Sequence, residues 1–418
     1  MKPSLIPIVA VAVAWTTSTP ARAAESNAAA ASANAFGLEL HRRLGAGNLV
    51  TSPWSISSAL AMTYAGAAGQ TKKEMAAVLH FPADEAALHG GFAALAADLR
   101  TLAERSRAQV EQAKKRAGPS TPTEINVANR LFGQSGYVFE TPFLDRVQND
   151  YEAPLELMDF QSNSERERMA INAWVAKQTR ERIKDLIPPR VIDSDTRLVL
   201  ANAVFLKAPW DESFADEKQA PFFVNGTERL DGPGLSRQAH FGHAVIPGGI
   251  AVTVPYADGG LQFVLFVPDA RDGLPALEKQ LTPATLTATA AAGSRLIALH
   301  FPAFKLEPDR VLLSKNLIAM GMPTAFDKPE GTADFSRMAP RRPNEYLCIG
   351  EVVHQAFIAV DKHGTEAAAA TAVVIPRVTS AIPSEEPLEV RVDRPFAFAI
   401  QHIATGTCLF LGRVMDPR

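Results

Sequence analysis

Apolar side chains recur at two spacings along the chain, and these spacings predict both helices and strands. Ile56, Leu60 and Tyr64 lie four residues apart, the spacing of one helix face. They come directly after Ser52-Pro53. A hydroxyl residue before a proline is typical of a helix start, because the hydroxyl caps free backbone N–H groups and the proline ring fits the first turn. We therefore expect a helix to begin at this proline.

A second helix is predicted near the middle of the chain. Ser164 and Glu167 have the spacing of a capping box, in which side chains and backbone at the helix start exchange hydrogen bonds. The apolar face that follows has three members: Ile171, Trp174 and Val175. Because prolines interrupt helices, this helix should end before Pro188-Pro189.

Strand-like runs occupy much of the remaining chain. Residues 198–206 read LVLANAVFL, which predicts a strand covered on both faces. Such a strand would bury the side chain of Asn202, which then needs hydrogen-bond partners. Five further runs have strand character: residues 261–267, 296–304, 346–361, 396–402 and 408–414. Helices dominate the first half and strands the second, so we expect an α+β protein rather than alternating βαβ units.

Composition and charge narrow the class of protein. The 418 residues are 47% hydrophobic and 21% charged, which excludes a disordered or collagen-like chain. The net charge of −3 gives no support for a nucleic-acid partner. Two cysteines exclude a disulfide scaffold. Cys348 and Cys408 could pair in an oxidising compartment, but their apolar, strand-like surroundings favour two separate buried thiols.

The first 23 residues have the order of a secretory signal peptide. Lys2 precedes an apolar stretch from Leu5 to Trp15, and Ala21-Arg22-Ala23 offers a small-residue cleavage site. The apolar stretch is too short to span a bilayer. We expect residues 24–418 to be exported as a soluble chain that is secreted or periplasmic. An N-terminal helix of the fold is the alternative.

No catalytic motif is found along the chain. A nucleophile elbow, a zinc-protease motif, a P-loop and a dinucleotide-binding glycine motif are all absent from the sequence. His240 and His243 lie three residues apart in what reads as a loop, but a metal site needs more ligands at matched spacing. The sequence therefore gives no support for an enzyme, a metal or a cofactor.

A segment of small residues follows the strand-like run that ends at Asp361. It reads G-T-E-A-A-A-A-T-A from Gly364. Alanine favours a helix, but an extended strand fits the flanks better. One face of that strand would have six small or apolar members: Thr365, Ala367, Ala369, Thr371, Val373 and Ile375. The only charged side chain, Glu366, would lie on the opposite face, so the segment could enter a sheet without burying an unpaired charge on the inner face.

Six segments carry a family resemblance. They are N-L-V-T-S-P-W-S-I-S-S-A-L from Asn48, A-N-R-L-F from Ala128, A-N-A-V-F-L-K-A-P-W from Ala201, F-P-A-F-K-L-E from Phe301, the segment from Gly364, and V-D-R-P-F-A-F-A-I from Val392. In this order, over nearly the whole mature chain, they resemble the serpins, which inhibit serine and sometimes cysteine proteases.

The resemblance implies a fold and a mechanism. The fold would be one α+β domain with three β-sheets (A, B and C), eight to nine helices and a reactive-centre loop at about residues 363–389. A protease would cleave this loop and form an acyl-enzyme, and the loop would then insert into the main sheet. The resemblance further implies a monomer that is not an enzyme, whose partner is a target serine protease held in a covalent complex. It implies no cofactor, nucleic acid or membrane.

Particular residues match the functional regions of the family. The polar "shutter" beneath the main sheet corresponds to Ser52, Ser55, Asn202 and His354. The "breach", where insertion begins, corresponds to Trp210 and Lys362. The hinge corresponds to Gly364, Thr365, Glu366, Ala367, Ala368, Ala369, Ala370 and Thr371. The family usually has an acidic residue at Lys362 and its basic partner at Ala303. The usual breach ion pair is therefore expected to be absent.

The bond cleaved by the protease follows from counting along the loop. In inhibitory members the hinge glycine is usually the fifteenth residue before the cut, which places the cut between Val378 and Thr379. Valine suits an elastase-like or subtilisin-like protease, whose pocket accepts small apolar side chains. The alternative cut, between Arg377 and Val378, would suit a trypsin-like enzyme. A second alternative is a non-inhibitory serpin that acts as a binding protein.

Overall fold

The computed structural model describes residues 27–113, 121–224, 226–342, 345–366 and 386–418. The predicted signal peptide lies outside these residues. The described residues form nine α-helices and one 3-10 helix: α1 (Ala28–Arg43), α2 (Pro53–Ala65), α3 (Gly69–Val78), α4 (Glu85–Ala113), α5 (Thr141–Tyr151), α6 (Phe160–Gln178), α7 (Leu274–Gln280), α8 (Pro283–Thr289), α9 (Ser314–Met320) and η1 (Thr324–Phe326).

Seventeen strands complete the described secondary structure. They are β1 (Leu49–Thr51), β2 (Glu124–Gln134), β3 (Glu156–Met158), β4 (Leu198–Pro209), β5 (Ala215–Val224), β6 (Glu228–Ile246), β7 (Gly249–Pro255), β8 (Leu261–Pro268), β9 (Gly293–Pro302), β10 (Phe304–Leu306), β11 (Val311–Leu312), β12 (Val352–Ala356), β13 (Ile358–Asp361), β14 (Gly364–Thr365), β15 (Leu388–Arg391), β16 (Phe396–His402) and β17 (Thr407–Val414).

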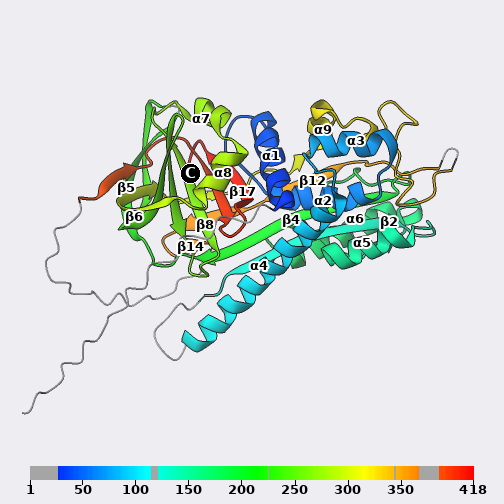
Figure 1. Ribbon diagram of the computed structural model, residues 1–418, viewed down its shortest axis with the longest axis horizontal. Coiled ribbons are helices and arrows are strands. Elements are labelled where there is room, and N and C mark those ends of the chain that lie inside the picture. Colours follow the sequence, from blue (N-terminus) through cyan, green and yellow to red (C-terminus); the bar gives the residue numbers. More distant parts are fainter. Residues whose placement is uncertain (1–26, 114–120, 225, 343–344, 367–385) are drawn as a thin grey trace, which may run out of the picture.

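The strands form two hydrogen-bonded networks. The smaller has the order β10-β13-β14-β4-β12-β11, with β2 on β4 and β3 on β2. The larger has the order β1-β17-β16-β8-β7-β6-β9-β15, with β5 on β6. Residues 228–236 of β6 pair with β5 and residues 242–246 pair with β7, so β6 joins two sheets into one network. The expected α+β architecture with three sheets and eight to nine helices is confirmed, and Figure 1 shows β4 as a long central strand.

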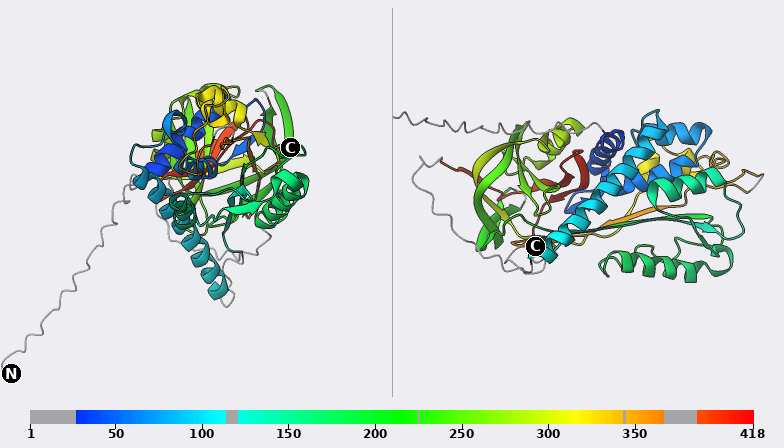
Figure 2. Two further views of the ribbon diagram at one scale, coloured as in Figure 1. Left: turned by 90° about the vertical axis from the view of Figure 1, so that its right-hand side faces the viewer. Right: turned by 60° about the horizontal axis from the view of Figure 1, so that its bottom comes forward.

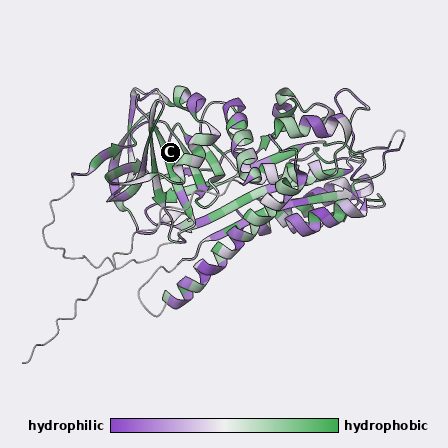
Figure 3. Ribbon diagram, in the orientation of Figure 1, coloured by the Kyte–Doolittle hydropathy of each residue, from purple (hydrophilic) through white to green (hydrophobic). Residues whose placement is uncertain are grey.

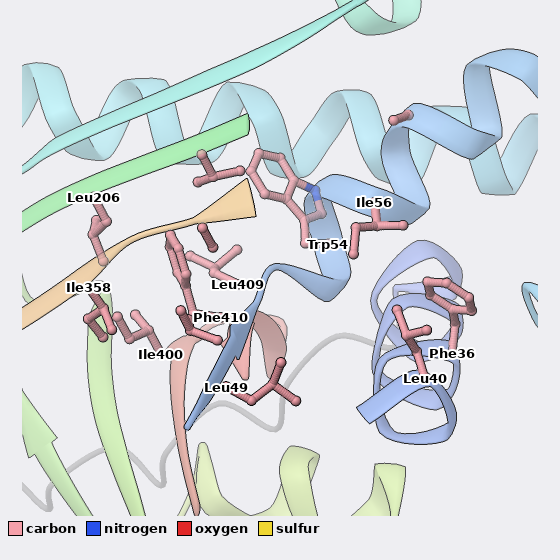
Figure 4. Close-up of a cluster of buried hydrophobic side chains, with 14 of the residues drawn as sticks. Phe36, Leu40, Leu49, Trp54, Ile56, Leu206, Ile358, Ile400, Leu409 and Phe410 are labelled. Carbon is pink, nitrogen blue, oxygen red and sulfur yellow. The ribbon is translucent and has the colours of Figure 1, made fainter. Parts of the chain in front are cut away.

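Helices cover the smaller sheet on both faces. Leu200, Val204 and Leu206 of β4 pack into the large core cluster that also contains Ile56 of α2. Ala201 and Ala203 belong to a second cluster together with residues of α6. Since successive side chains of a strand point to opposite faces, β4 lies between α2 and α6. Figure 2 shows α6 on the outer side of β2 and β4, and Figure 4 shows side chains of α1, α2, β4 and β17 meeting in the large cluster.

The two predicted helix starts have different outcomes. The first is confirmed, because α2 begins at Pro53 and the Ser52 side chain accepts a hydrogen bond from the backbone N–H of Ser55. The second is wrong in position. Helix α6 begins at Phe160, and its cap is Asp159, which accepts from the N–H of Ser162. The backbone is non-helical at Asn163, so the predicted start coincides with a kink inside α6.

The long apolar runs became strands with small changes at their ends. Residues 198–206, 261–267, 396–402 and 408–414 all lie in strands, whereas residues 346–351 of the predicted 346–361 strand do not. Residues 215–255, which sequence patterning left unassigned, contribute β5, β6 and β7. Figure 3 shows β4 as hydrophobic along most of its length, in agreement with its burial on both faces.

Both cysteines are free thiols, as the sequence favoured. Cys408 is fully buried in β17, and desolvation raises the pKa of its thiol far above the ordinary value. Cys348 is only half-buried, in the segment before β12. In the part of the chain that the structure describes, we find no helix with the length and apolar character needed to cross a membrane.

Candidate functional site

The start of the segment of small residues lies inside the smaller sheet. Strand β14 occupies the slot between β13 and β4, with Thr365 opposite Val360 on one side and Ala208 on the other. The backbone N–H of Glu366 donates to the carbonyl of Ala359 at 2.7 Å and extends this pairing by one residue. The prediction of an extended segment rather than a helix is therefore confirmed for Gly364 and Thr365.

Gly364 is needed at the entrance of the slot because the neighbouring backbone is very close. Its φ is +153°, and a Cβ added there would lie 2.2 Å from the carbonyl oxygen of Ala208 and 2.7 Å from the Cα of Pro209. Both atoms belong to the backbone of β4, which cannot move aside without breaking its own pairing. Only glycine permits this approach.

An aromatic stack holds the side chain of Thr365. Thr365 is 1% exposed, and its hydroxyl lies 2.5 Å from the hydroxyl of Tyr256. The Tyr256 ring stacks on Trp210 with centroids 4.7 Å apart. The Trp210 indole N–H donates to the carbonyl of Asp361 at 2.9 Å, and its backbone N–H donates to the carbonyl of His363 at 2.9 Å. Trp210 therefore contacts the turn that leads into the slot, and Tyr256, which the sequence did not indicate, contacts the first inserted side chain.

Charged groups lie on both sides of the entrance. The Lys362 ammonium lies 2.6 Å from the carboxylate of Asp216, and both side chains are exposed. Ala303 packs against the core and offers no charge. The usual pair between these two positions is absent, as expected, and Asp216 is the partner instead. An exposed pair of this kind contributes about 0–1 kcal/mol.

The hinge carboxylate is buried. The side chain of Glu366 is 6% exposed, and Nε of Arg182 lies 2.6 Å from its Oε1. Desolvation raises the pKa of Glu366, and the Arg182 charge opposes that rise. The prediction that Glu366 points away from the Thr365 face agrees with this contact. Its partner Arg182, in the connection between α6 and β4, was missed because nothing in the local sequence links the two residues.

Below the slot, β4 and β12 pair directly. Five residues of β12 lie in parallel register with residues 200–204 of β4, and His354 is opposite Asn202. The two side chains also bond to each other, with Nδ1 of His354 2.6 Å from Oδ1 of Asn202. The slot that holds β14 is therefore closed beneath it by this ladder and by a side-chain hydrogen bond across it.

The four predicted shutter residues form one buried network. The backbone N–H of Ser52 donates to Nε2 of His354 at 3.1 Å, and the Asn202 amide donates to the Ser55 hydroxyl at 2.6 Å. Asn129 of β2, which sequence reasoning did not select, accepts hydrogen bonds from the Asn202 amide and from the Ser55 hydroxyl. Its only sequence signal was its place in the A-N-R-L-F segment.

The network fixes the protonation state of His354. Nε2 accepts a hydrogen bond, so the ring proton lies on Nδ1 and is donated to Asn202. Complete burial lowers the pKa of His354 to about 3, so the ring is neutral at physiological pH. The neutral ring therefore links Ser52, the cap of α2, to Asn202 of β4.

This geometry can accept a further strand. Neighbouring strands lie about 4.8 Å apart, so a strand inserted between β4 and β12 would nearly double their separation. The register pairs of residues 352–356 would break, and so would the bond between His354 and Asn202. Each broken pairing would be replaced by pairing on both sides of the new strand. The site could therefore accept an extension of β14 into the space between β4 and β12.

Comparison with known proteins identifies the architecture. The family described as "Serpin (serine protease inhibitor)" matches residues 31–417. The chain belongs to the serpin family. It is 36% identical to leukocyte elastase inhibitor A of Rattus norvegicus, over 91% of this chain and 97% of that protein. It is 30% identical to Iris of Ixodes ricinus, with the same coverage. The structure of uncleaved ovalbumin matches with a TM-score of 0.75 and 26% identity, over 93% of this chain and 100% of that one.

The remaining predicted residues of this serpin are placed as follows. Ala367, Ala368, Ala369, Ala370 and Thr371 of the hinge, and Arg377, Val378 and Thr379 at the reactive bond, lie outside the described residues. His240 and His243 lie in strand β6 and not in the predicted loop. Their odd spacing directs the two side chains to opposite faces of the strand, and the described residues contain no group of metal-binding side chains.

Proposed function

We propose that this serpin inhibits elastase-like serine proteases by inserting its cleaved reactive-centre loop into the smaller sheet. The observation that carries the proposal is β14, two residues long, lying between β13 and β4 directly above the β4–β12 ladder. The hinge has therefore already begun the strand that insertion would extend. After Glu366, the sequence continues with small residues from Ala367 to Ala372, and these could enter the sheet at little steric cost.

The target class is argued from the cleavage position and from the relatives. Val378, fifteenth from Gly364, is a small apolar residue suited to an elastase-like or subtilisin-like pocket. Several similar proteins bear the name leukocyte elastase inhibitor, including those of Rattus norvegicus and Bos taurus. Arg377, one residue earlier, supports a trypsin-like target as the alternative.

We further propose the oligomeric state, the end product of inhibition and the location of the protein. The chain acts as a monomer and ends in a covalent acyl complex with the protease, so it is consumed and is not an enzyme. Residues 1–23 direct its export, and the mature chain is secreted or periplasmic. Its targets are then proteases outside the cytoplasm. Mass spectrometry of the mature protein from its native host would test the cleavage after Ala23.

The function is tested with purified protein and three proteases. Elastase, subtilisin and trypsin are incubated with the serpin and the mixtures are run on denaturing gels. A complex with elastase or subtilisin that survives SDS supports the proposal, and a complex with trypsin alone would assign the reactive bond to Arg377. Cleavage by every protease without a complex would overturn the inhibitory mechanism and favour a binding role.

A substitution at the hinge separates insertion from simple docking. Thr365→Arg places a charged side chain where Thr365 is buried against Tyr256, and an unpaired buried charge is costly. We expect this variant to be cleaved as a substrate without forming the complex. Thr101→Arg, on the exposed surface of α4, is the matched control and should inhibit normally. Full inhibition by Thr365→Arg would contradict loop insertion.

A further inference from the structure

A cavity of about 430 Å³ opens beside the hinge. It lies on the α6 side of the smaller sheet, since Lys207 and Phe205 of β4 share the face of Ala201 and Ala203. Its charged lining is dominated by cations. They come from three separate elements: Arg180 and Arg182 after α6, Lys207 of β4, and Lys305 of β10.

The cations are only partly compensated. Arg182 pairs with Glu366, Arg180 pairs with Glu124, and Lys305 pairs with Glu307 at 3.0 Å. Lys207 has no ion pair within 4 Å among the described residues, although it adds to the positive field on Glu366. The other carboxylate in the lining, Asp361, accepts hydrogen bonds from the backbone N–H groups of His363 and Gly364. The lining itself therefore carries four cations against two carboxylates, and the carboxylates of Glu124 and Glu307 that pair with two of these cations lie outside it.

Two of these cations lie near the ring of Phe357, which also lines the cavity. The guanidinium of Arg182 lies 5.4 Å from the centroid of the Phe357 ring, and the ammonium of Lys305 lies 5.6 Å from it. Such cation–π contacts restrict the side chains without neutralising their charge. Two half-exposed cations near one ring, with Lys207 in the same lining, offer several positive charges to negative oxygens.

Glu366 contacts only one of these cations closely. Its Oε1 is buried and lies 2.6 Å from Nε of Arg182, and it has no ion pair with Lys207 or Lys305 among the described residues. Burial raises the pKa of this carboxylate, and the contact with Arg182 and the charges of Lys207 and Lys305 oppose that rise. A ligand with several charged oxygens could bond to Arg182, Lys207 and Lys305 together, which a single carboxylate does not achieve.

We propose that this cavity is a binding site for a small multivalent oxyanion, which competes with Glu366 for Arg182 and so loosens the hinge. The competition is reciprocal: an anion that displaces Glu366 weakens the anchoring of β14, and withdrawal of β14 strengthens anion binding. Binding itself does not depend on the proposed inhibitory function. Only its consequence for the inhibition rate rests on that function.

Calorimetry with inorganic pyrophosphate tests the site on the full mature protein. Titrations are run at constant ionic strength in NaCl, because screening by salt would otherwise mimic a competing ion. We expect saturable binding at one site. Lys207→Gln should weaken it about tenfold, and Glu366→Gln should strengthen it about tenfold, because the first removes a cation and the second removes the internal competitor.

Lys279→Gln is the control, since Lys279 is an exposed lysine at the end of α7, which contributes no residue to the cavity. It should bind pyrophosphate as the wild type does. Citrate replaces pyrophosphate in a second series, and equal sensitivity to Lys207→Gln would show that charged oxygens rather than phosphorus are recognised. Absence of saturable heat, equal affinities in all variants, or weaker binding by Glu366→Gln would each overturn the proposal. No protease is present, so these results do not depend on whether the serpin inhibits.

Discussion

Replacing His354 by alanine should weaken the closed sheet. The imidazole of His354 on β12 bonds to the N–H of Ser52, the cap of α2, and to Oδ1 of Asn202 on β4, so it links these elements across the β4–β12 ladder. It is completely buried, so no water can take over these contacts in the unchanged network. His354→Ala therefore leaves one buried donor and one buried acceptor without their partner.

The size of the effect follows from these two groups. An unsatisfied buried polar group costs about 1–3 kcal/mol, so with two such groups the closed native state should lose about 2–6 kcal/mol in total. The bond between His354 and Asn202 is already broken when a strand enters between β4 and β12, so the inserted state loses less. A difference of about 1–2 kcal/mol between the two states would speed sheet opening about 5- to 30-fold.

Two measurements check this reasoning. The apparent thermal midpoint of His354→Ala should fall by about 3 °C or more. During incubation at a temperature below that midpoint, the variant should convert faster than the wild type to a form that resists urea on a gradient gel. Gln355→Ala is the matched control, because the adjacent side chain points to the other face and makes one bond, 3.3 Å to the carbonyl of Pro308. If His354→Ala and Gln355→Ala behaved alike, the network would not control sheet opening.

Three further predictions concern other parts of the molecule. Gly364→Ala should act as a substrate without forming the protease complex, because the added Cβ would lie 2.2 Å from a β4 carbonyl, and complex formation on gels checks this. Burial lowers the pKa of His354 to about 3 and that of His89 to about 4, so as pH falls below about 6.5 the unfolded chain binds protons first. Each of these two histidines should lower the free energy of unfolding by about 2 kcal/mol at pH 5 relative to pH 8, which should appear as a lower urea midpoint. A urea midpoint independent of pH would refute this prediction. Mass spectrometry of the serpin cleaved by elastase should find a new N-terminus at Thr379, and one at Val378 would assign the cut to Arg377.

The parts of the fold that the sequence predicts are those decided by local patterns. Residues 198–206 formed a strand because their apolar run can be satisfied only between two covering layers. The Ser52-Pro53 start was visible because the Ser52 cap and the backbone N–H of Ser55 that donates to it lie within one helical turn. Ser164 misled for the same local reason: its spacing to Glu167 fits a cap, but Asp159 caps the first turn earlier and the chain bends at Asn163.

The parts that the sequence does not predict are contacts between distant segments. Lys362 and Asp216 are 146 residues apart, and Tyr256 and Thr365 are 109 apart. No spacing rule links such pairs, because the sheet topology alone brings them together. The need of Asn202 for partners was readable from its apolar surroundings, but the identity of one partner, Asn129, became visible only when β2 took its register beside β4.

The position of the shutter within the sheet explains how a loop could stay outside until it is cut. The first residues of the inserted strand are already ordered in β14, where Thr365 is paired on both sides. Extending it opens the five register pairs of β12 with β4, and each inserted residue costs about 1–2 kcal/mol of chain entropy. Each ladder hydrogen bond contributes about 1 kcal/mol net, so the bonds offset this loss of chain entropy only after they form on both sides of the inserted strand. The opposition is concentrated at His354 and Asn202, in the middle of the ladder, so partial insertion gains little. Strands β14 and β15 belong to different networks, so an uncut chain stays attached at both ends, and we expect cleavage to be needed before the strand extends past that point.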